Sequence, residues 1–193
     1  MIDYFYYITG VSIRQVSLQF IFHAYPHILK MGDDMTKQTK WKPYVFWISL
    51  AEAVGILSGL LTREGSTAFG ATVLQPPFSP PAIVFPIVWT ILYALMGISV
   101  TRISLAPPSI DRSRGLNLFV MQLVVNFFWS LIFFNAQAYG FAFLWLLLLW
   151  ALVLWMIAVF RRVDLLAAIL QIPYLLWLTF AAYLSCGVWQ LNS

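Results

Sequence analysis

The chain has 193 residues, of which 62% are hydrophobic and 9% are charged, and its mean hydropathy is +0.84. Soluble globular proteins carry about 25% charged residues, so this composition argues against a water-soluble enzyme and predicts an integral membrane protein. The formal net charge is +4, and the single cysteine, Cys186, rules out a disulfide within the chain.

The first 40 residues do not match the pattern of a membrane span. Charged residues and two histidines divide them into pieces shorter than the roughly 20 apolar residues that a spanning helix needs, and they lack the features of a signal peptide. Residues 1–40 are either an N-terminal arm or upstream sequence that is not part of the native protein, with Met35 as the start, and we favour the second interpretation. His23 and His27 have the spacing of two ligands on one helix face, but we predict no metal or haem-ligating site there.

The rest of the chain, residues 41–193, contains five largely apolar segments that are each long enough to cross a bilayer as a helix. The run LWLLLLWALVLWMIAVF is apolar on every face, which excludes the alternation of a transmembrane β-strand. The expected fold class is all-α, an integral membrane bundle of five transmembrane helices. The predicted helices cover about residues 44–61, 84–103, 116–134, 141–160 and 165–188.

The links between these segments differ in charge. Ten Lys and Arg residues lie in the N-terminal arm and in the second and fourth links, whereas Arg63 alone lies on the opposite side. The positive-inside rule therefore predicts a cytoplasmic N-terminus, an external C-terminus and an external first link, residues 62–81. This topology accounts for the basic residues without a nucleic-acid partner, and the absence of a transit peptide favours a bacterial cell membrane.

The first link ends in a proline-rich segment. Proline stiffens the backbone into extended structure, and Pro86 falls near the first turn of the next helix, where its missing N–H does little harm. We therefore predict a semi-rigid lid before the second span. Its residues are Pro76, Pro77, Phe78, Pro80 and Pro81.

Three predicted helices carry polar or aromatic residues at helical spacing on a single face. Each face lines a ligand site or forms a helix-packing seam, and spacing alone favours the seam. Pro173 is also expected to kink the last helix. The three faces are Trp89, Tyr93 and Met96 or Gly97; Gln122, Asn126, Trp129 and Phe133; and Pro173, Trp177, Ala181 and Leu184.

The first predicted helix carries a carboxylate about halfway along its length. Glu52 is either a functional group or a neutral side chain bonded to a neighbouring helix. Gly55 and Gly59 form a small-xxx-small pair that permits close backbone approach. Motifs of soluble enzymes, such as a phosphate loop or a nucleophile elbow, do not occur, and no span carries a pair of histidines at metal-ligating spacing.

Three motifs closely resemble those of the TspO family, the tryptophan-rich sensory proteins, also called translocator proteins or peripheral-type benzodiazepine receptors. They are PPAIVFPIVWTILYALMG at 80–97, QLVVNFFWSLIFF at 122–134 and VDLLAAILQIPYLLWLTFAAYL at 163–184. The resemblance implies a homodimeric five-helix bundle whose pocket, under the first link, binds porphyrins and aromatic drug-like ligands, and sterols in animal members. The pocket residues carried over by motif position are Trp89, Tyr93, Asn126, Trp129, Trp177, Ala181 and Leu184.

The expected function is that of a membrane receptor or translocator for protoporphyrin IX, haem and related flat ligands, with a role in tetrapyrrole handling or stress regulation. No cofactor is required, and the expected partners are membrane lipid, the porphyrin and a second copy of the chain. No catalytic residue is assigned. The alternatives are light-dependent degradation of protoporphyrin, for which Trp89 and Trp177 are the candidate residues, and transport of hydrophobic ligands across the membrane.

The sequence departs from the family pattern in the first link, near the end of the last helix, and at Phe141, where animal members have a pocket Trp. The first link of family members carries a Trp-Tyr pair and a Lys, whereas this chain has Phe69, Gly70 and Gln75, which weakens the expectation of a lid anchored by that Lys. Near the end of the last helix, Cys186 and Gln190 replace the Tyr and the basic residue of the animal sterol motif. Sterol binding through that weak motif is therefore not expected.

The aromatic residues make up 18% of the chain and include nine tryptophans, more than interfacial belts require. We assign them three roles by position. Interfacial anchors are Trp41 and Trp189, lipid-facing or packing residues are Trp145, Trp150 and Trp155, and pocket residues are Trp89, Trp129 and Trp177.

Overall fold

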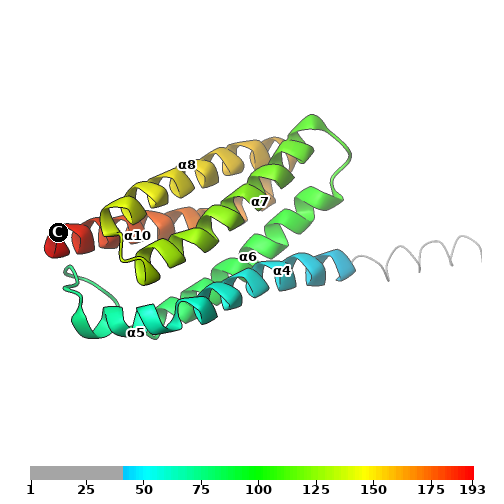
Figure 1. Ribbon diagram of the computed structural model, residues 1–193. Coiled ribbons are helices and arrows are strands. Elements are labelled where there is room, and N and C mark those ends of the chain that lie inside the picture. The colour runs from blue at the N-terminus through cyan, green and yellow to red at the C-terminus, as the bar shows by residue number, and fades with distance from the viewer. Residues whose placement is uncertain (1–40) are drawn as a thin grey trace, which may run out of the picture. The chain divides into compact units, whose positions relative to one another are not determined.

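The structure is a computed structural model that describes residues 41–193 (Figure 1). The predictions for the N-terminal arm, including the start at Met35 and the two histidines, lie outside the described residues. From Pro43 to Ser193 the chain forms one compact unit. Five of its helical segments are long and apolar enough to span a membrane, which confirms the predicted fold class.

The described chain is made of helices joined by short links, and the long helices run roughly side by side in Figure 1. Because each span satisfies its own backbone hydrogen bonds, this is the arrangement that hydrocarbon favours. In chain order the elements are α4 (Trp41–Leu61), α5 (Arg63–Thr72), α6 (Val84–Leu105), α7 (Ile110–Ser130), the π-helical turn η1 (Leu131–Asn135), α8 (Tyr139–Val163), α9 (Leu165–Leu170) and α10 (Ile172–Asn192).

The two ends of this bundle differ, and we name them by their links. The α6–α7 and α8–α9 links lie at one end, which we call the basic end because it carries most of the arginines. α5, the proline-rich loop and the C-terminal end of α10 lie at the other, which we call the loop end.

The first link differs from the prediction, because α5 occupies its first half. The single residue Thr62, with φ −105° and ψ 6°, joins α4 to α5, and its backbone N–H donates to the Ser58 carbonyl at 3.0 Å. The Thr62 carbonyl then accepts from the Ser66 N–H at 2.8 Å. Extended backbone begins only at Val73, with φ −95° and ψ 131°, so the extended part of the link is limited to its proline-rich second half.

The last span is broken at the predicted place. α9 ends at Leu170, and α10 begins at Ile172 with Pro173 in its first turn, where a missing N–H is tolerated. Gln171 forms the junction and is fully buried. The expected kink at Pro173 is therefore a junction between two helices.

Two glycines bring α4 against α6. A Cβ on Gly97 would lie 2.5 Å from the Ile48 Cα, so the two backbones cross at a distance that only glycine allows. Gly55 faces the Tyr93 ring, which a Cβ there would overlap. Gly59, by contrast, has nothing within 4 Å of the corresponding position. Only the first glycine of the small-xxx-small pair is therefore used for close packing within the described residues.

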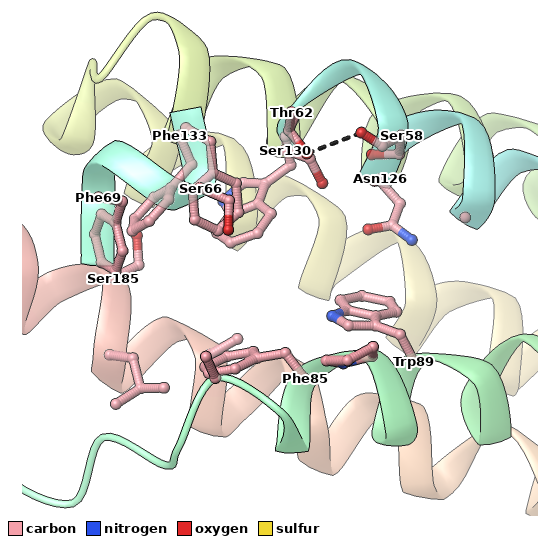
Figure 2. A pocket seen from close by; sticks show the side chains of 18 of the residues that line it. Ser58, Thr62, Ser66, Phe69, Phe85, Trp89, Asn126, Ser130, Phe133 and Ser185 are labelled. Carbon is pink, nitrogen blue, oxygen red and sulfur yellow. Dashed lines mark hydrogen bonds between the residues drawn. The ribbon is translucent and has the colours of Figure 1, made fainter. Parts of the chain in front are cut away.

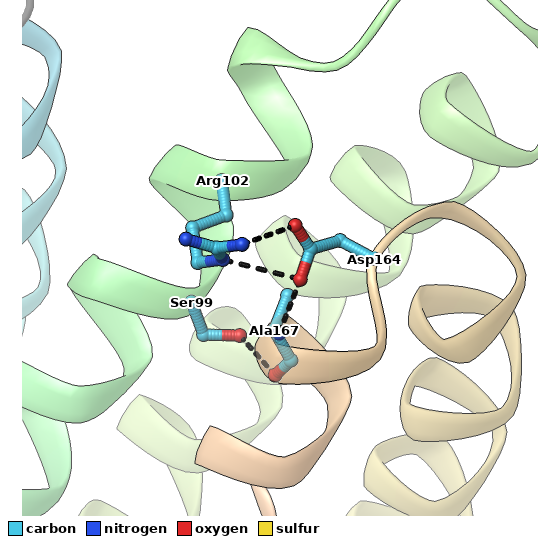
Figure 3. A network of polar contacts seen from close by, with 4 residues as sticks. All are labelled: Ser99, Arg102, Asp164 and Ala167. Carbon is cyan, nitrogen blue, oxygen red and sulfur yellow. Dashed lines mark hydrogen bonds and ion pairs between the residues drawn. The ribbon is translucent and has the colours of Figure 1, made fainter.

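A polar clasp holds α6 to α9 at the basic end (Figure 3). The Arg102 guanidinium donates to both carboxylate oxygens of Asp164, at 3.1 and 2.7 Å. Asp164 also caps α9 by accepting the Ala167 N–H at 2.8 Å, and the Ser99 hydroxyl donates to the Ala167 carbonyl at 2.7 Å. The hydrogen bond from Arg102 is the main cause that lowers the pKa of Asp164 below its ordinary value.

Candidate ligand-binding cavity

A cavity of about 610 Å³ lies toward the loop end of the bundle (Figure 2). Its walls come from α4, α5, the proline-rich loop, α6, α7 with η1, and α10, together with Leu146 of α8. This volume is within the range of about 300–1,000 Å³ typical of small-molecule sites. Figure 2 shows side chains from opposite walls facing one another across an open space.

All seven residues predicted as a ligand site line this one cavity, although their role in binding stays a prediction. α6 contributes two of them, α7 two and α10 three, and each set comes from one helix face. They are Trp89, Tyr93, Asn126, Trp129, Trp177, Ala181 and Leu184.

The residues predicted as a lid are only partly at the cavity. Pro80 lines it, whereas Pro81 does not, and Pro76 is buried against Gly187 of α10. Phe78 has a φ of 63° and follows Pro77 in a turn that is closed by the Ser79 N–H and the Pro76 carbonyl at 3.3 Å. A positive φ after proline is the pattern of a type II turn. This turn carries the Phe78 ring away from the cavity and leaves it 86% exposed.

The loop is held to α10 without the lysine that the family pattern supplies. The Asn192 side chain accepts from the Leu74 N–H at 3.0 Å and donates to the Leu74 carbonyl at 2.9 Å. The Tyr183 hydroxyl donates to the Pro77 carbonyl at 3.0 Å. Residues other than that lysine therefore hold the proline-rich loop to α10.

Aromatic rings form two sides of the cavity. The Trp89 ring lies 5.4 Å from that of Tyr93 and 6.1 Å from that of Tyr174, measured between centroids. Trp129 is stacked on Phe133 at 5.0 Å, and its indole N–H donates to the Ala142 carbonyl at 3.1 Å. These contacts fix the rings as preformed faces against which a flat ligand can stack.

The polar groups of the cavity lie at two levels. Nearer the middle of the bundle, the Asn126 side-chain NH₂ donates to the Tyr93 hydroxyl at 3.0 Å, and both residues are buried. Figure 2 shows the Asn126 amide turned into the open space. Glu52 of α4 lines the same part of the cavity, while Arg63 and Ser66 of α5 line it toward the loop end.

Sequence reasoning missed the α4 and α5 wall except for Glu52 and the two glycines. The signal was present, because positions 52, 55, 59, 62 and 66 follow one helical face across the boundary between the two helices. The face is hard to recognise in the sequence because its last two positions lie beyond the apolar segment, in residues that the sequence predicts as a link. Conversely, Gln122 belongs to the same stripe as Asn126 but does not line the cavity, since its amide is buried against the Met96 sulfur at 4.0 Å.

Comparison with known proteins agrees with this architecture. The model of the TspO/MBR family matches residues 47–190. "Tryptophan-rich protein TspO" of Chlorobaculum tepidum is 34% identical over 146 residues, which cover 75% of this chain and 92% of that protein. "Translocator protein" of Ovis aries is 33% identical over 154 residues, 79% of this chain and 91% of that protein. "Protein CrtK" of Rhodobacter capsulatus is 38% identical over 119 residues, 61% of this chain and 74% of that protein.

Proposed function

We infer that this chain, which belongs to the TspO/MBR family and is a multi-pass membrane protein, is a receptor whose cavity binds protoporphyrin IX, haem or related flat hydrophobic ligands. The observation that carries the proposal is the meeting of three tryptophans from three helices, Trp89, Trp129 and Trp177, around one cavity of about 610 Å³. Large rigid rings supply most of the contact energy in sites of this kind. A role in tetrapyrrole handling or stress regulation follows from such binding.

Tryptophan fluorescence tests the proposal directly. Protoporphyrin IX added to the purified protein in detergent is expected to quench the emission in a saturable way. The double variant Trp89→Ala, Trp177→Ala is expected to bind at least tenfold more weakly, because two stacking faces are lost. Trp155→Ala is the matched control, since Trp155 is 58% exposed and lies outside the cavity wall. Unchanged affinity in the double variant would contradict the site assignment.

A second candidate function is light-dependent oxidation of the bound porphyrin by molecular oxygen. The observation that favours it is that Trp89 and Trp177 both line the cavity, where an excited porphyrin would lie beside their indole rings. Molecular oxygen is the oxidant, and both atoms of one O₂ would be added across a bond of the porphyrin, so that no outside reductant is needed. Illumination should then convert the porphyrin absorbance into a new species, with oxygen consumed. Trp89→Phe and Trp177→Phe variants that bind normally should lose this conversion, and equal rates in wild type and variants would eliminate the candidate.

Transport across the bilayer is the remaining alternative, and the carboxylate in the cavity wall is the feature that favours it. Glu52 lies on the wall of a cavity that is built between membrane spans. Porphyrin flux into protein-containing liposomes, compared between wild type and Glu52→Gln, tests this alternative. Equal flux with and without protein would exclude it.

We further propose that the basic end faces the cytoplasm of a bacterial cell and that two copies associate as a dimer. Five arginines lie at the basic end, whereas Arg63 alone lies near the loop end. By the positive-inside rule, the end with more basic residues faces the cytoplasm. Single-cysteine variants in a Cys186→Ser background, Arg161→Cys and Gln137→Cys, test the orientation in intact cells. A membrane-impermeant thiol reagent should label only the second, and labelling of the first alone would reverse the topology.

A further inference from the structure

The cavity contains only two charged side chains. Residues 43–193 include ten Asp, Glu, Lys and Arg residues, and of these only Glu52 and Arg63 line the cavity. Glu64 follows Arg63 in α5, and the other seven lie at or beside the links of the basic end. The electrostatic field in the cavity is therefore dominated by one carboxylate and one guanidinium.

These two residues line the cavity from successive helices, Glu52 from α4 and Arg63 from the first residue of α5. Thr62 lies between the two helices with φ −105° and ψ 6°. Arg63 is thus placed toward the loop end, and Glu52 about halfway along α4.

Neither residue has an ion-pair partner among residues 41–193. The ion pairs among residues 41–193 involve Arg102, Arg114 and Arg162, all at the basic end. Arg63 is exposed, and its neighbours on the cavity wall are the hydroxyl residues Ser66 and Thr67. The guanidinium is therefore free to accept a carboxylate from a ligand in a paired, two-donor geometry.

The inner part of the cavity has the opposite character. Asn126 uses its NH₂ group on the Tyr93 hydroxyl, which leaves its carbonyl oxygen to face the open space. Together with the Glu52 carboxylate, this places two acceptor groups in the inner part of the cavity, so a ligand carboxylate there would meet electrostatic repulsion from an ionised Glu52.

We propose that the cavity binds its ligand in one orientation, with the ligand's carboxylates at Arg63 and its uncharged edge toward Glu52 and Asn126. The ligand class is a flat hydrophobic acid whose carboxylates lie on one edge, and porphyrins of the protoporphyrin type have this form. The inference rests on the proposed function and adds to it the residue that selects the acid and the direction in which it enters.

A pair of ligands isolates the contribution of charge. Protoporphyrin IX and its dimethyl ester share one ring system, but only the first carries carboxylates. Wild type is expected to bind the acid more tightly than the ester. Arg63→Gln is expected to weaken binding of the acid about tenfold and to leave the ester unchanged, because only a charge-assisted pair is lost. Arg161→Gln is the matched control that removes one positive charge at the basic end, and it should change neither affinity.

Glu52→Gln tests the orientation independently. Because the carboxylates lie away from Glu52, the ratio of acid affinity to ester affinity is expected to stay at its wild-type value. A rise in this ratio would place the carboxylates at the inner end and overturn the inference.

Two further results would distinguish a failure of this inference from a failure of the proposed function. If Arg63→Gln weakens acid and ester equally, or neither of them, while wild type binds both, the proposed function stands and the role of Arg63 is refuted. If wild type binds neither ligand, the proposed function itself fails, and the inference fails with it. Each variant is first required to elute from a sizing column as wild type does.

Discussion

Replacing Asp164 by alanine is expected to destabilise the protein by about 2 kcal/mol, because this carboxylate has two roles at the basic end. It caps α9 through the Ala167 N–H at 2.8 Å, and the loss of an aspartate N-cap costs about 1 kcal/mol. It also accepts two hydrogen bonds from Arg102, whose side chain is 33% exposed against 22% for Asp164. A bidentate pair that is partly screened by water contributes about 1 kcal/mol more.

Asp164→Asn separates the two roles, because its amide oxygen can keep the cap while the charge is lost. Reversible unfolding in mixed micelles should therefore give a cost of about 1 kcal/mol for Asp164→Asn, half that of the alanine variant. A double-mutant cycle with Arg102→Gln should return a coupling of about 1 kcal/mol. Equal costs for the asparagine and alanine variants, with no coupling to Arg102, would refute the clasp. Asp111→Asn is the control, since its ion pairs are longer, at 3.8 Å, and their arginine side chains are 63% and 64% exposed.

Three further predictions concern pH, packing and the loop. Because the pKa of Asp164 is lower in the folded protein than its ordinary value of 3.8, the ionised carboxylate stabilises the fold fully above pH 3.8. This stabilisation is lost as the pH falls through the folded-state pKa, so wild type should lose more stability than Asp164→Asn between pH 5 and pH 2. Parallel curves of stability against pH for the two proteins would contradict this. Gly55→Ala should destabilise the protein by about 1–3 kcal/mol, because its Cβ would overlap the Tyr93 ring, whereas Gly59→Ala should be neutral or stabilising; similar melting temperatures for the two variants would contradict the α4–α6 packing. Asn192→Ala removes both hydrogen bonds to Leu74 and should increase proteolysis within the proline-rich loop while the melting temperature changes little, and an unchanged cleavage rate would show that other contacts hold the loop.

The five spans could be predicted from sequence because the bilayer demands long apolar helices, and hydropathy registers that demand directly. α5 could not be predicted in this way. Its sequence, REGSTAFGAT, is short and polar, and two of its residues are glycines, which lower helix propensity. It follows α4 after the single residue Thr62, whose carbonyl accepts the Ser66 N–H, and its Phe69 ring packs on Phe133 and Phe134 of η1. Its existence therefore depends on its neighbour, which local propensity cannot report.

Sequence spacing predicts individual residues on three walls of the cavity, but it does not predict where along each helix the cavity ends. Asn126 and Gln122 lie one turn apart on the same face of α7, and spacing treats them alike. In the structure the first meets the cavity and the second is enclosed beside Met96. Whether a residue of α7 meets the cavity or a neighbouring side chain depends on how the helices pack together. A single-helix pattern carries no information about it.

The excess of tryptophan is explained by what each indole N–H and ring contacts. Trp145 and Trp150, which sequence position assigned to the lipid or to packing, donate to the Val125 carbonyl and to the Thr179 hydroxyl, so they fasten α8 to α7 and to α10. Trp129 both lines the cavity with its ring and joins two helices, since its indole N–H donates to the Ala142 carbonyl of α8. A wall tied in this way keeps its position when the ligand leaves. The cavity is therefore preorganised by the same class of side chain that would stack on its ligand, which lowers the ordering cost of binding.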